Sequence, residues 1–284
     1  MISPSKSAIA ISENDHQRSD FVRGLVQKPC TPLQSARLSN HAIPRRIVQF
    51  WDNPDRIPQD VRNCLDSWHQ LEALGFERLL FNDRSARVFI AKALSAQHVE
   101  AYEKCYHPAM KSDYFRLCFL LSQGGCYIDA DDACCGTKAE LLFADDRLKL
   151  QPLCYSIDTD SMVESALFTQ PGELLSSNHI FYFNNNPIAA SAENPVVSYA
   201  LARATRLLAG EITDELPEIQ STTGPGNLTA SLVAHAATDG SYGSDRLVVL
   251  SDWESYARTI WPLSYRKDTR NWRLSNRRRF TLEL

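Results

Sequence analysis

The sequence predicts an α/β fold built on one mostly parallel sheet with flanking helices. Three observations support this fold class. From residue 43 onward, short apolar and β-branched runs alternate with segments whose apolar residues recur at helical spacing. Glycine or proline marks the ends of these segments, and polar residues follow directly after the runs. Such alternation is typical of parallel sheets, in which ligands bind beyond the carboxyl ends of the strands.

The first strand is expected at residues 43–51, an apolar and β-branched run that ends in Trp51. Residues 58–74 then repeat apolar side chains at helical spacing, and a second strand is expected at residues 78–81. Asp83 follows that strand and is placed to cap the next helix. Both strand ends therefore carry side chains suited to a binding site.

A longer helix is expected from Pro108 to about residue 123, because an apolar stripe recurs there at spacings of three and four. Gly124 and Gly125 end it and lead directly into a short strand at residues 126–128. Further strands are expected over residues 148–157, 163–168 and 247–250, a helix over residues 195–208, and a short helix after a turn at residues 223–226.

Composition excludes several classes of protein. The net charge of −4 among 284 residues gives no general affinity for nucleic acid or an anionic membrane. No stretch approaches the roughly 18 continuous apolar residues of a transmembrane segment, and the N-terminus lacks the apolar core of a secretory signal. The eight cysteines form no C-x-x-C pair and the seven histidines no zinc-binding pair, which indicates reduced thiols in a cytoplasmic protein.

Two regions are expected along the chain. Residues 1–40 are rich in polar side chains and are expected to form a loosely ordered tail, while residues 41–284 form the folded domain. A polar, serine-rich leader is also found in exported bacterial effectors, so export remains an alternative to a cytoplasmic location.

The acidic turn Asp129, Ala130, Asp131, Asp132 follows the strand at residues 126–128. Neighbouring carboxylates repel one another and raise each other's pKa, so a bound cation is a simple way to neutralise them. With no Cys-x-x-Cys or histidine pair nearby, oxygen ligands suit Mn²⁺ or Mg²⁺. The alternative is a solvated acidic loop.

Asp113 and Arg116 lie three residues apart on the helix that precedes the turn, on one face and away from its apolar stripe. They could form an ordinary surface ion pair. The double glycine, however, ends this helix beside the strand that carries the acidic turn, so both side chains can face the same pocket. A carboxylate, a guanidinium and a metal-binding pair together suit a sugar phosphate.

Residues 111–131 resemble the S-D-x-x-R…G-G-x-Y-x-D-x-D signature of the DXD glycosyltransferases of family 32. That group includes yeast Golgi mannosyltransferases and bacterial capsular polysaccharide transferases, and the clostridial glucosylating toxins are related to it. Residues 43–51 resemble the family's first strand, with Gln49 in place of a histidine. Thr223 to Pro225 resembles a recurrent T-G-P turn, and Asn271 with Trp272 resembles a terminal S-W.

This resemblance implies a GT-A fold and a retaining transfer of a hexose from a UDP- or GDP-sugar to a glycan, lipid-linked or protein acceptor, as in polysaccharide biosynthesis. It implies that Trp51 stacks on the base, that Asp113 and Arg116 bind the donor, and that Asp129 contacts ribose and Mn²⁺ or Mg²⁺. The catalytic set it implies is Asp113, Arg116 and Asp131, with Asp131 as a metal ligand and Trp272 at the donor. The family's histidine before that tryptophan has no counterpart between residues 265 and 270.

Two other functions use similar residues. Phosphatases of the haloacid dehalogenase type also carry D-x-D after a strand, but on the first strand and with Thr or Val where this chain has Ala133. A non-catalytic, transferase-like interaction module is the third possibility, and the complete set of carboxylates argues against it.

Overall fold

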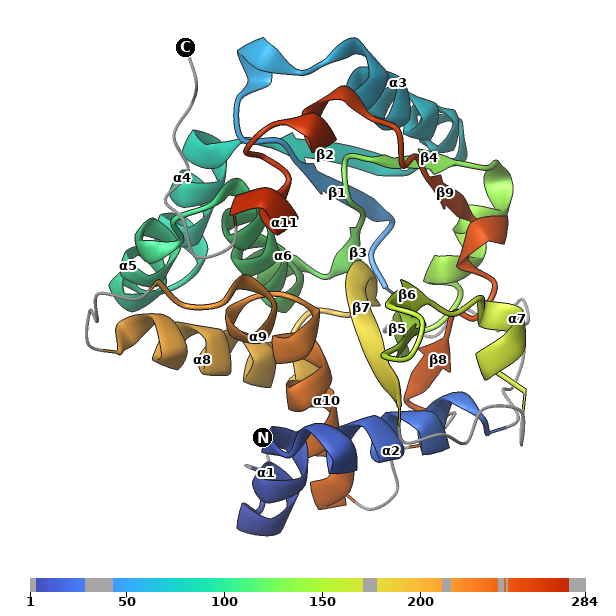
Figure 1. Cartoon of the computed structure of the whole chain (residues 1–284). Coiled ribbons are helices and arrows are strands. Elements are labelled where there is room, and N and C mark those ends of the chain that lie inside the picture. The colour runs from blue at the N-terminus through green and yellow to red at the C-terminus, as the bar shows by residue number, and fades with distance from the viewer. Residues whose placement is uncertain are drawn as a thin grey trace.

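The structure is a computed structural model that describes residues 4–28, 43–170, 178–210, 216–239, 243 and 245–275. A central sheet carries helices on its flanks, and the C-terminal segment returns to lie near α6 and the ends of β1 and β3 (Figure 1). Among these residues, no helix combines the length and apolar character that crossing a membrane requires. The predicted α/β class is confirmed.

The central sheet is parallel on one side and mixed on the other. Its first three strands pair in parallel, whereas β7 pairs antiparallel with both β3 and β5. In spatial order the strands are β2 (Glu77–Phe81), β1 (Arg46–Phe50), β3 (Gly125–Tyr127), β7 (His179–Ala190), β5 (Leu148–Ser156) and β6 (Ser161–Met162), with β8 (Leu247–Val249) parallel to β5. A separate pair joins β4 (Asp132–Cys134) to β9 (Ala257–Thr259).

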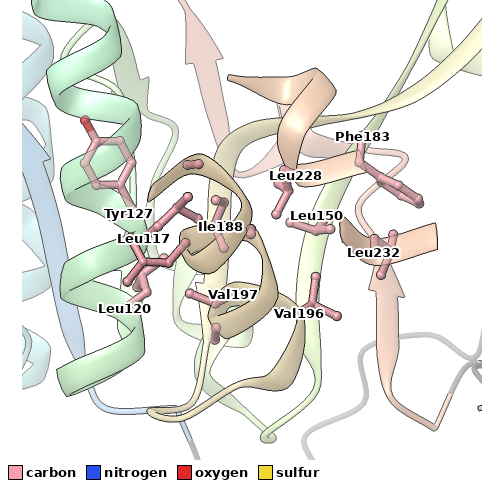
Figure 2. Packing of buried hydrophobic residues seen from close by; sticks show 14 of the residues in the cluster. Leu117, Leu120, Tyr127, Leu150, Phe183, Ile188, Val196, Val197, Leu228 and Leu232 are labelled. Atoms are coloured by element: carbon pink, nitrogen blue, oxygen red, sulfur yellow. The ribbon is translucent and has the colours of Figure 1, made fainter. Parts of the chain in front are cut away.

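Helix α6 (Pro108–Gln123) lies at the centre of the main core. Its Leu117 and Leu120 pack in one cluster with Ile188 of β7 and Val197 of α8 (Figure 2). Buried apolar side chains of this kind supply most of a domain's stability, which fixes α6 against β7. The other helices are α3 (Gln59–Ser67), α4 (Asp83–Ala93), α5 (Ala96–Lys104), α8 (Pro195–Ala209), α9 (Ile219–Thr222) and α10 (Pro225–Asp239).

Gly124 and Gly125 join α6 to β3 in a space that admits no side chain. Their φ angles are +63° and +123°. A Cβ on Gly124 would lie 2.7 Å from the backbone nitrogen of Ala192, and one on Gly125 would lie 2.9 Å from the carbonyl oxygen of Arg46. Glycine is required here for both reasons, and the tight junction places α6 directly beside the strand that ends in the acidic turn.

The C-terminal segment runs through two short helical turns, η5 (Ser264–Lys267) and α11 (Trp272–Ser275). It is tied to the segment that follows β1: the backbone N–H of Ser264 donates to Asp60 of α3 at 2.6 Å, and the Arg270 guanidinium lies 3.3 Å from Asp52. These contacts place the segment across the carboxyl end of β1.

The structure corrects the expected loose tail for residues 6–26, where two helices form: α1 (Lys6–Glu13) and α2 (Asp15–Val26). Asn14 caps α2, and Val22, Leu25 and Val26 enter the main core. Their spacing of three and four was overlooked because polar residues separate these few apolar positions. Residues 29–40 lie outside the described part of the chain, and the remaining division, with one domain over residues 41–284, stays a prediction.

Two further expectations differ from the structure. The strand expected at residues 163–168 is largely the short helix α7 (Ser165–Phe168), since a run of apolar residues fits a buried helical turn equally well. Residues 58–74 divide into α3 and a 3₁₀ segment, Trp68–Leu74. Strand β7 is not expected from the sequence, because its three asparagines and its proline are residues depleted in strands.

Candidate active site

A cavity of about 590 Å³ opens beyond the carboxyl ends of β1 and β3 and extends along β7, β5 and β6. Its floor is the sheet, and one wall comes from the C-terminal segment. The structure brings together in this cavity all the residues that the sequence analysis assigned to a site: Trp51, Asp113, Arg116, Asp129, Asp131 and Trp272.

Arg116 contacts several groups in the buried part of the site. It is only 2% exposed, and its Nη2 lies 2.9 Å from both Asp113 Oδ1 and Asp129 Oδ1. Its Nη1 donates to the carbonyl of Asn185, and the guanidinium lies 4.1 Å from the ring centroid of Tyr127. A planar guanidinium with several hydrogen bonds fixes its partners in direction, so Arg116 positions both carboxylates. It is not an exposed ion pair.

Asp113 is held from three directions. Besides Arg116, the Asn185 amide donates to it at 2.8 Å and the Thr223 hydroxyl at 3.4 Å. A Cβ on Gly224 would lie 3.3 Å from Asp113 Oδ2. The T-G-P turn found in the sequence is therefore a wall of the site, 110 residues away along the chain. Burial raises the pKa of Asp113, while Arg116 and the two hydrogen bonds oppose that shift.

Asp129 stands at the end of β3 with about a third of its side chain facing the cavity, 34% exposed. Its backbone N–H donates to Asn186 Oδ1 at 2.9 Å, and its carbonyl accepts from Gln49 Nε2 at 3.5 Å. Burial in the wall raises the pKa of Asp129 to about 7; Arg116 opposes this shift, and Asp131 and Asp132 add to it. An additional positive charge in the cavity would favour the ionised form.

Asp131 faces the cavity from the opposite side of the turn and is 8% exposed. The Tyr265 hydroxyl donates to its Oδ2 at 2.7 Å, and Arg266 Nη2 forms a short ion pair with the same oxygen. Both partners come from η5, more than 130 residues later in the chain. The C-terminal segment thus supplies the counter-charge of the expected metal ligand.

Asp132 has a different position from the other two carboxylates. It is fully buried and accepts from the Asn186 amide at 2.9 Å and from Trp253 Nε1 at 3.3 Å. Burial raises the pKa of Asp132 to about 6, to which Asp131 adds, while hydrogen bonds from Thr259, Asn186 and Trp253 oppose the shift. Asp132 anchors the turn to the second sheet, and the cavity is left to Asp129 and Asp131.

Sequence reasoning missed Asn185 and Asn186, which join the parts of the site. The Asn185 side chain holds Asp113 while its carbonyl holds Arg116, and the Asn186 side chain bridges the backbone of Asp129 and the carboxylate of Asp132. Three successive asparagines before Pro187 are an unusual run between apolar residues. That run was the available signal, because amide side chains are costly to bury without partners.

The two predicted aromatic contacts of the donor lie in the cavity wall. The Trp51 indole N–H donates to the carbonyl of Arg56 at 3.3 Å, its ring meets that of Tyr265 edge-on at 5.4 Å, and Arg270 lies 5.8 Å from it. Trp272 packs against the main core and carries Arg273 over its ring at 4.7 Å. Aromatic and cationic groups therefore alternate along the wall.

Asp129 and Asp131 fit a hard divalent cation as two protein ligands. Their carboxylates reach the same cavity, and Mg²⁺ and similar ions are commonly held by one or two carboxylates while water and substrate phosphates complete the shell. Among the described residues, no cluster of three or more His, Cys, Asp or Glu forms a complete protein cage. Because Arg266 pairs with Asp131 Oδ2, its guanidinium competes with a cation for that oxygen.

Comparison with known proteins gives the same assignment for this region. Residues 58–148 match the family described as "Glycosyltransferase sugar-binding region containing DXD motif". Over 97 residues the chain is 30% identical to "Uncharacterized glycosyltransferase L373" of Acanthamoeba polyphaga mimivirus. That alignment covers 32% of this chain and 37% of the viral protein, so the chain matches less than half of its relative.

Over residues 58–148 this chain is similar to a glycosyltransferase sugar-binding region that contains a DXD motif. The acidic turn and the residues Asp113 and Arg116 lie within the matched residues. The structure of a protein named "PaToxG Glycosyltransferase" is similar to this one with a TM-score of 0.43 and 16% sequence identity, over 88% of this chain and 91% of the other. Glycosyltransferases with the DXD motif generally use a divalent metal and a nucleotide-sugar donor.

Proposed function

We propose that this protein is a retaining glycosyltransferase of the GT-A type and of family 32, which moves a hexose from a UDP- or GDP-sugar with Mn²⁺ or Mg²⁺ at the acidic turn. One observation carries the proposal: Asp113, Arg116, Asp129 and Asp131, separated in sequence, converge on one cavity beside Trp51. A sugar diphosphate needs such a combination of hydroxyl acceptors, cation-binding carboxylates and an aromatic surface for the base.

The residues of the site divide the work of binding. Trp51 offers an aromatic surface at the end of β1, and Asp129, Asp131 and the C-terminal arginines face the diphosphate position. Asp113, held by Asn185 and Thr223, is fixed to accept hydrogen bonds from sugar hydroxyls. A bound divalent cation supplies positive charge that stabilises the departing nucleoside diphosphate. Arg116 keeps Asp113 and Asp129 in place while that charge develops.

The far end of the same cavity suits the acceptor. The sheet order puts β6 at the edge opposite β2, so the cavity wall formed by Gln151, Met162, Tyr182 and Asn184 lies well away from the strand that ends at Trp51. Asn184 Nδ2 donates to Gln151 Oε1 at 3.0 Å, and Tyr182 contacts Met162. Amides beside an aromatic ring can bind a sugar ring or another hydroxyl-bearing acceptor, whether glycan, lipid-linked or protein.

The decisive experiment is a screen of UDP- and GDP-sugars for Mn²⁺-dependent hydrolysis, comparing the wild type with Asp131→Ala. We expect the wild type to hydrolyse one donor and the substitution to lower that rate by about a hundredfold or more, because a ligand of the charge-stabilising cation is lost. Asp252→Ala is a matched control, since Asp252 is an exposed carboxylate paired with Lys138 outside the cavity.

Two results would reject this function. Equal donor hydrolysis in wild type and Asp131→Ala would remove the acidic turn from the chemistry. Turnover of a simple aryl phosphate without use of any nucleotide sugar would favour the phosphatase alternative. For location, we propose the cytoplasm, which is supported by the seven described cysteines being free thiols. An exported bacterial effector is the alternative, and it is distinguished by fractionation of producing cells.

A further inference from the structure

Arg266 is poorly satisfied where it lies. Its Nη2 pairs with Asp131, but its Nε is buried and has no hydrogen-bond partner among the residues that the structure describes. Arg116 differs, because its Nε, Nη1 and Nη2 all donate, to Ser112, Asn185 and Asp129. A buried donor without a partner loses its hydration and gains no hydrogen bond in return. The position of Arg266 at Asp131 is therefore one that a better anionic partner can displace.

A second guanidinium lies next to Arg266. The two side chains share the ring of Trp261, with Arg266 at 4.0 Å and Arg273 at 5.2 Å from its centroid. Arg273 forms no ion pair with a carboxylate in the described part of the chain. Two cations on one ring repel each other and together attract an anion, and phosphate oxygens match the planar donors of arginine. All three residues line the cavity.

The backbone around Arg266 is held by contacts that do not involve the Arg266 side chain. Ser264 is fixed to Asp60 through its backbone N–H at 2.6 Å and its hydroxyl at 3.0 Å. On the other side, His107 Nε2 lies 2.9 Å from the carbonyl oxygen of Thr269, and Arg270 pairs with Asp52. A change of partner by Arg266 therefore needs only side-chain rotations, which are fast and inexpensive compared with loop movement.

We infer that Arg266 exchanges between two partners, the Asp131 carboxylate before a divalent cation binds and the diphosphate of the donor afterwards. This inference rests on the proposed function and deepens it. Arg266 is an internal competitor of the metal at Asp131 and, together with Arg273, a ligand of the diphosphate. Metal and nucleotide then promote each other's binding, because each makes the new position of Arg266 more favourable.

The competition can be measured without turnover. A ligand that needs a partly populated state binds with an affinity lowered by that state's fraction, so removing the competitor tightens binding. We expect Arg266→Gln to tighten Mn²⁺ binding in the absence of nucleotide by about tenfold. The measurement is titration with Mn²⁺ alone, followed by electron paramagnetic resonance of the free ion. Unchanged or weaker Mn²⁺ binding by Arg266→Gln overturns the inference.

Two variants separate competition from other effects. Arg258→Gln removes the same charge from β9, next to the acidic turn in the sheet but outside the cavity, and should leave the Mn²⁺ affinity within about twofold. If Arg258→Gln tightens Mn²⁺ binding as much as Arg266→Gln, general charge is the cause and the inference fails. Arg266→Met keeps the apolar stem over Trp261, so it serves if Arg266→Gln does not fold.

Adding UDP or GDP completes the test. In the wild type the nucleotide should tighten Mn²⁺ binding, and in Arg266→Gln it should do so by a smaller factor. An equal factor in both proteins would overturn the exchange of partners. The proposed function fails separately: if neither wild type nor Arg266→Gln binds Mn²⁺ even with UDP or GDP, and no donor is hydrolysed, there is no metal-dependent transferase site. Donor hydrolysis by the wild type with unchanged Mn²⁺ affinity in Arg266→Gln rejects only the inference.

Discussion

The two arginines that neutralise the acidic turn hold it in different ways. Arg116 comes from α6, 13 residues before Asp129, is 2% exposed and also binds Asp113 and the backbone of β7. Arg266 comes from η5, 135 residues after Asp131, and leaves its buried Nε without a partner. The Arg116–Asp129 pair is therefore fixed by the core of the fold, whereas the Arg266–Asp131 pair is formed by a segment that lines the cavity.

This difference separates the parts of the site that must stay fixed from those that can respond to a ligand. Asp113, Asp129 and Asp132 are each held by at least one group from α6 or β7. Asp131 has side-chain partners only from the C-terminal segment among the hydrogen bonds and ion pairs of the described residues. Preorganised groups favour catalysis because they need no rearrangement during the reaction. The pair with Arg266 supplies a counter-charge to Asp131.

Replacement of Arg116 should have the largest effect on the free energy of unfolding. We expect Arg116→Met to lower the free energy of unfolding by about 3–5 kcal/mol, because it leaves the buried carboxylate of Asp113 and the partly exposed carboxylate of Asp129 without their counter-charge. Arg266→Met should lower it by about 1 kcal/mol or less, since it removes an unsatisfied donor together with the ion pair. Urea unfolding at pH 7 measures both values. Equal losses would show that the two pairs are equivalent and remove the distinction between them.

The bridge made by Asn186 should have the next largest effect. Asn186→Ala leaves the Asp129 N–H and the Asp132 carboxylate each without one partner, and we expect a loss of about 2–3 kcal/mol. Asn184→Ala is the matched control: this asparagine of the same strand bonds only Gln151 through its side chain among the described contacts, and its loss should stay below about 1 kcal/mol. If thermal unfolding shows no difference between the variants, β7 does not hold the turn.

The carboxylate of Asp145, which lies outside the cavity, has a lowered pKa, whereas the pKa of Asp129 is raised. Burial opposes the charged form of Asp145, but hydrogen bonds from Arg147 and Lys149 outweigh it and lower the pKa of Asp145 from 3.8 to about 2. The stabilisation is present above about pH 4 and is lost as the pH falls toward 2. Asp145→Asn should therefore be about 1 kcal/mol less stable than the wild type at pH 7 and nearly equal to it near pH 2.

Unfolding by denaturant across that pH range measures this difference. A deficit that stays constant from pH 7 to pH 2 would mean that the charge of Asp145 does not stabilise the fold. In the acidic turn the pKa of Asp129 is raised, whereas the pKa of Asp145 is lowered. Asp145 is satisfied by the two cationic side chains beside it, whereas Asp129 faces the cavity, where a ligand can supply positive charge.

Sequence patterns predicted the parts of the site that are local. The apolar stripe of α6, its two terminal glycines and the acidic turn form a continuous stretch, so spacing alone places Asp113 and Arg116 beside the turn. The structure agrees, and it also puts the T-G-P turn against Asp113. These predictions succeeded because helix period and glycine geometry act over a few residues.

The parts of the site that were not predicted from the sequence depend on contacts between residues far apart in the chain. β7 reads poorly as a strand because Asn and Pro are disfavoured there, yet burial between β3 and β5 outweighs that preference. The role of Arg266 follows only from the path of the C-terminal segment, which propensity does not encode. The densest basic run of the sequence, Arg277 to Arg279, lies outside the described residues.

Helix α2 has a practical consequence for anyone who shortens the protein. Ser19 accepts the backbone N–H of Phe181 at 2.9 Å, and Val22, Leu25 and Val26 belong to the same apolar cluster as Phe181 and Phe183 of β7. Cutting at residue 41, the domain boundary predicted from the sequence, would remove the side chains that pack against β7, the strand that carries Asn185 and Asn186. A shortened protein that keeps residues 4–26 therefore keeps the apolar contacts that α2 makes with β7.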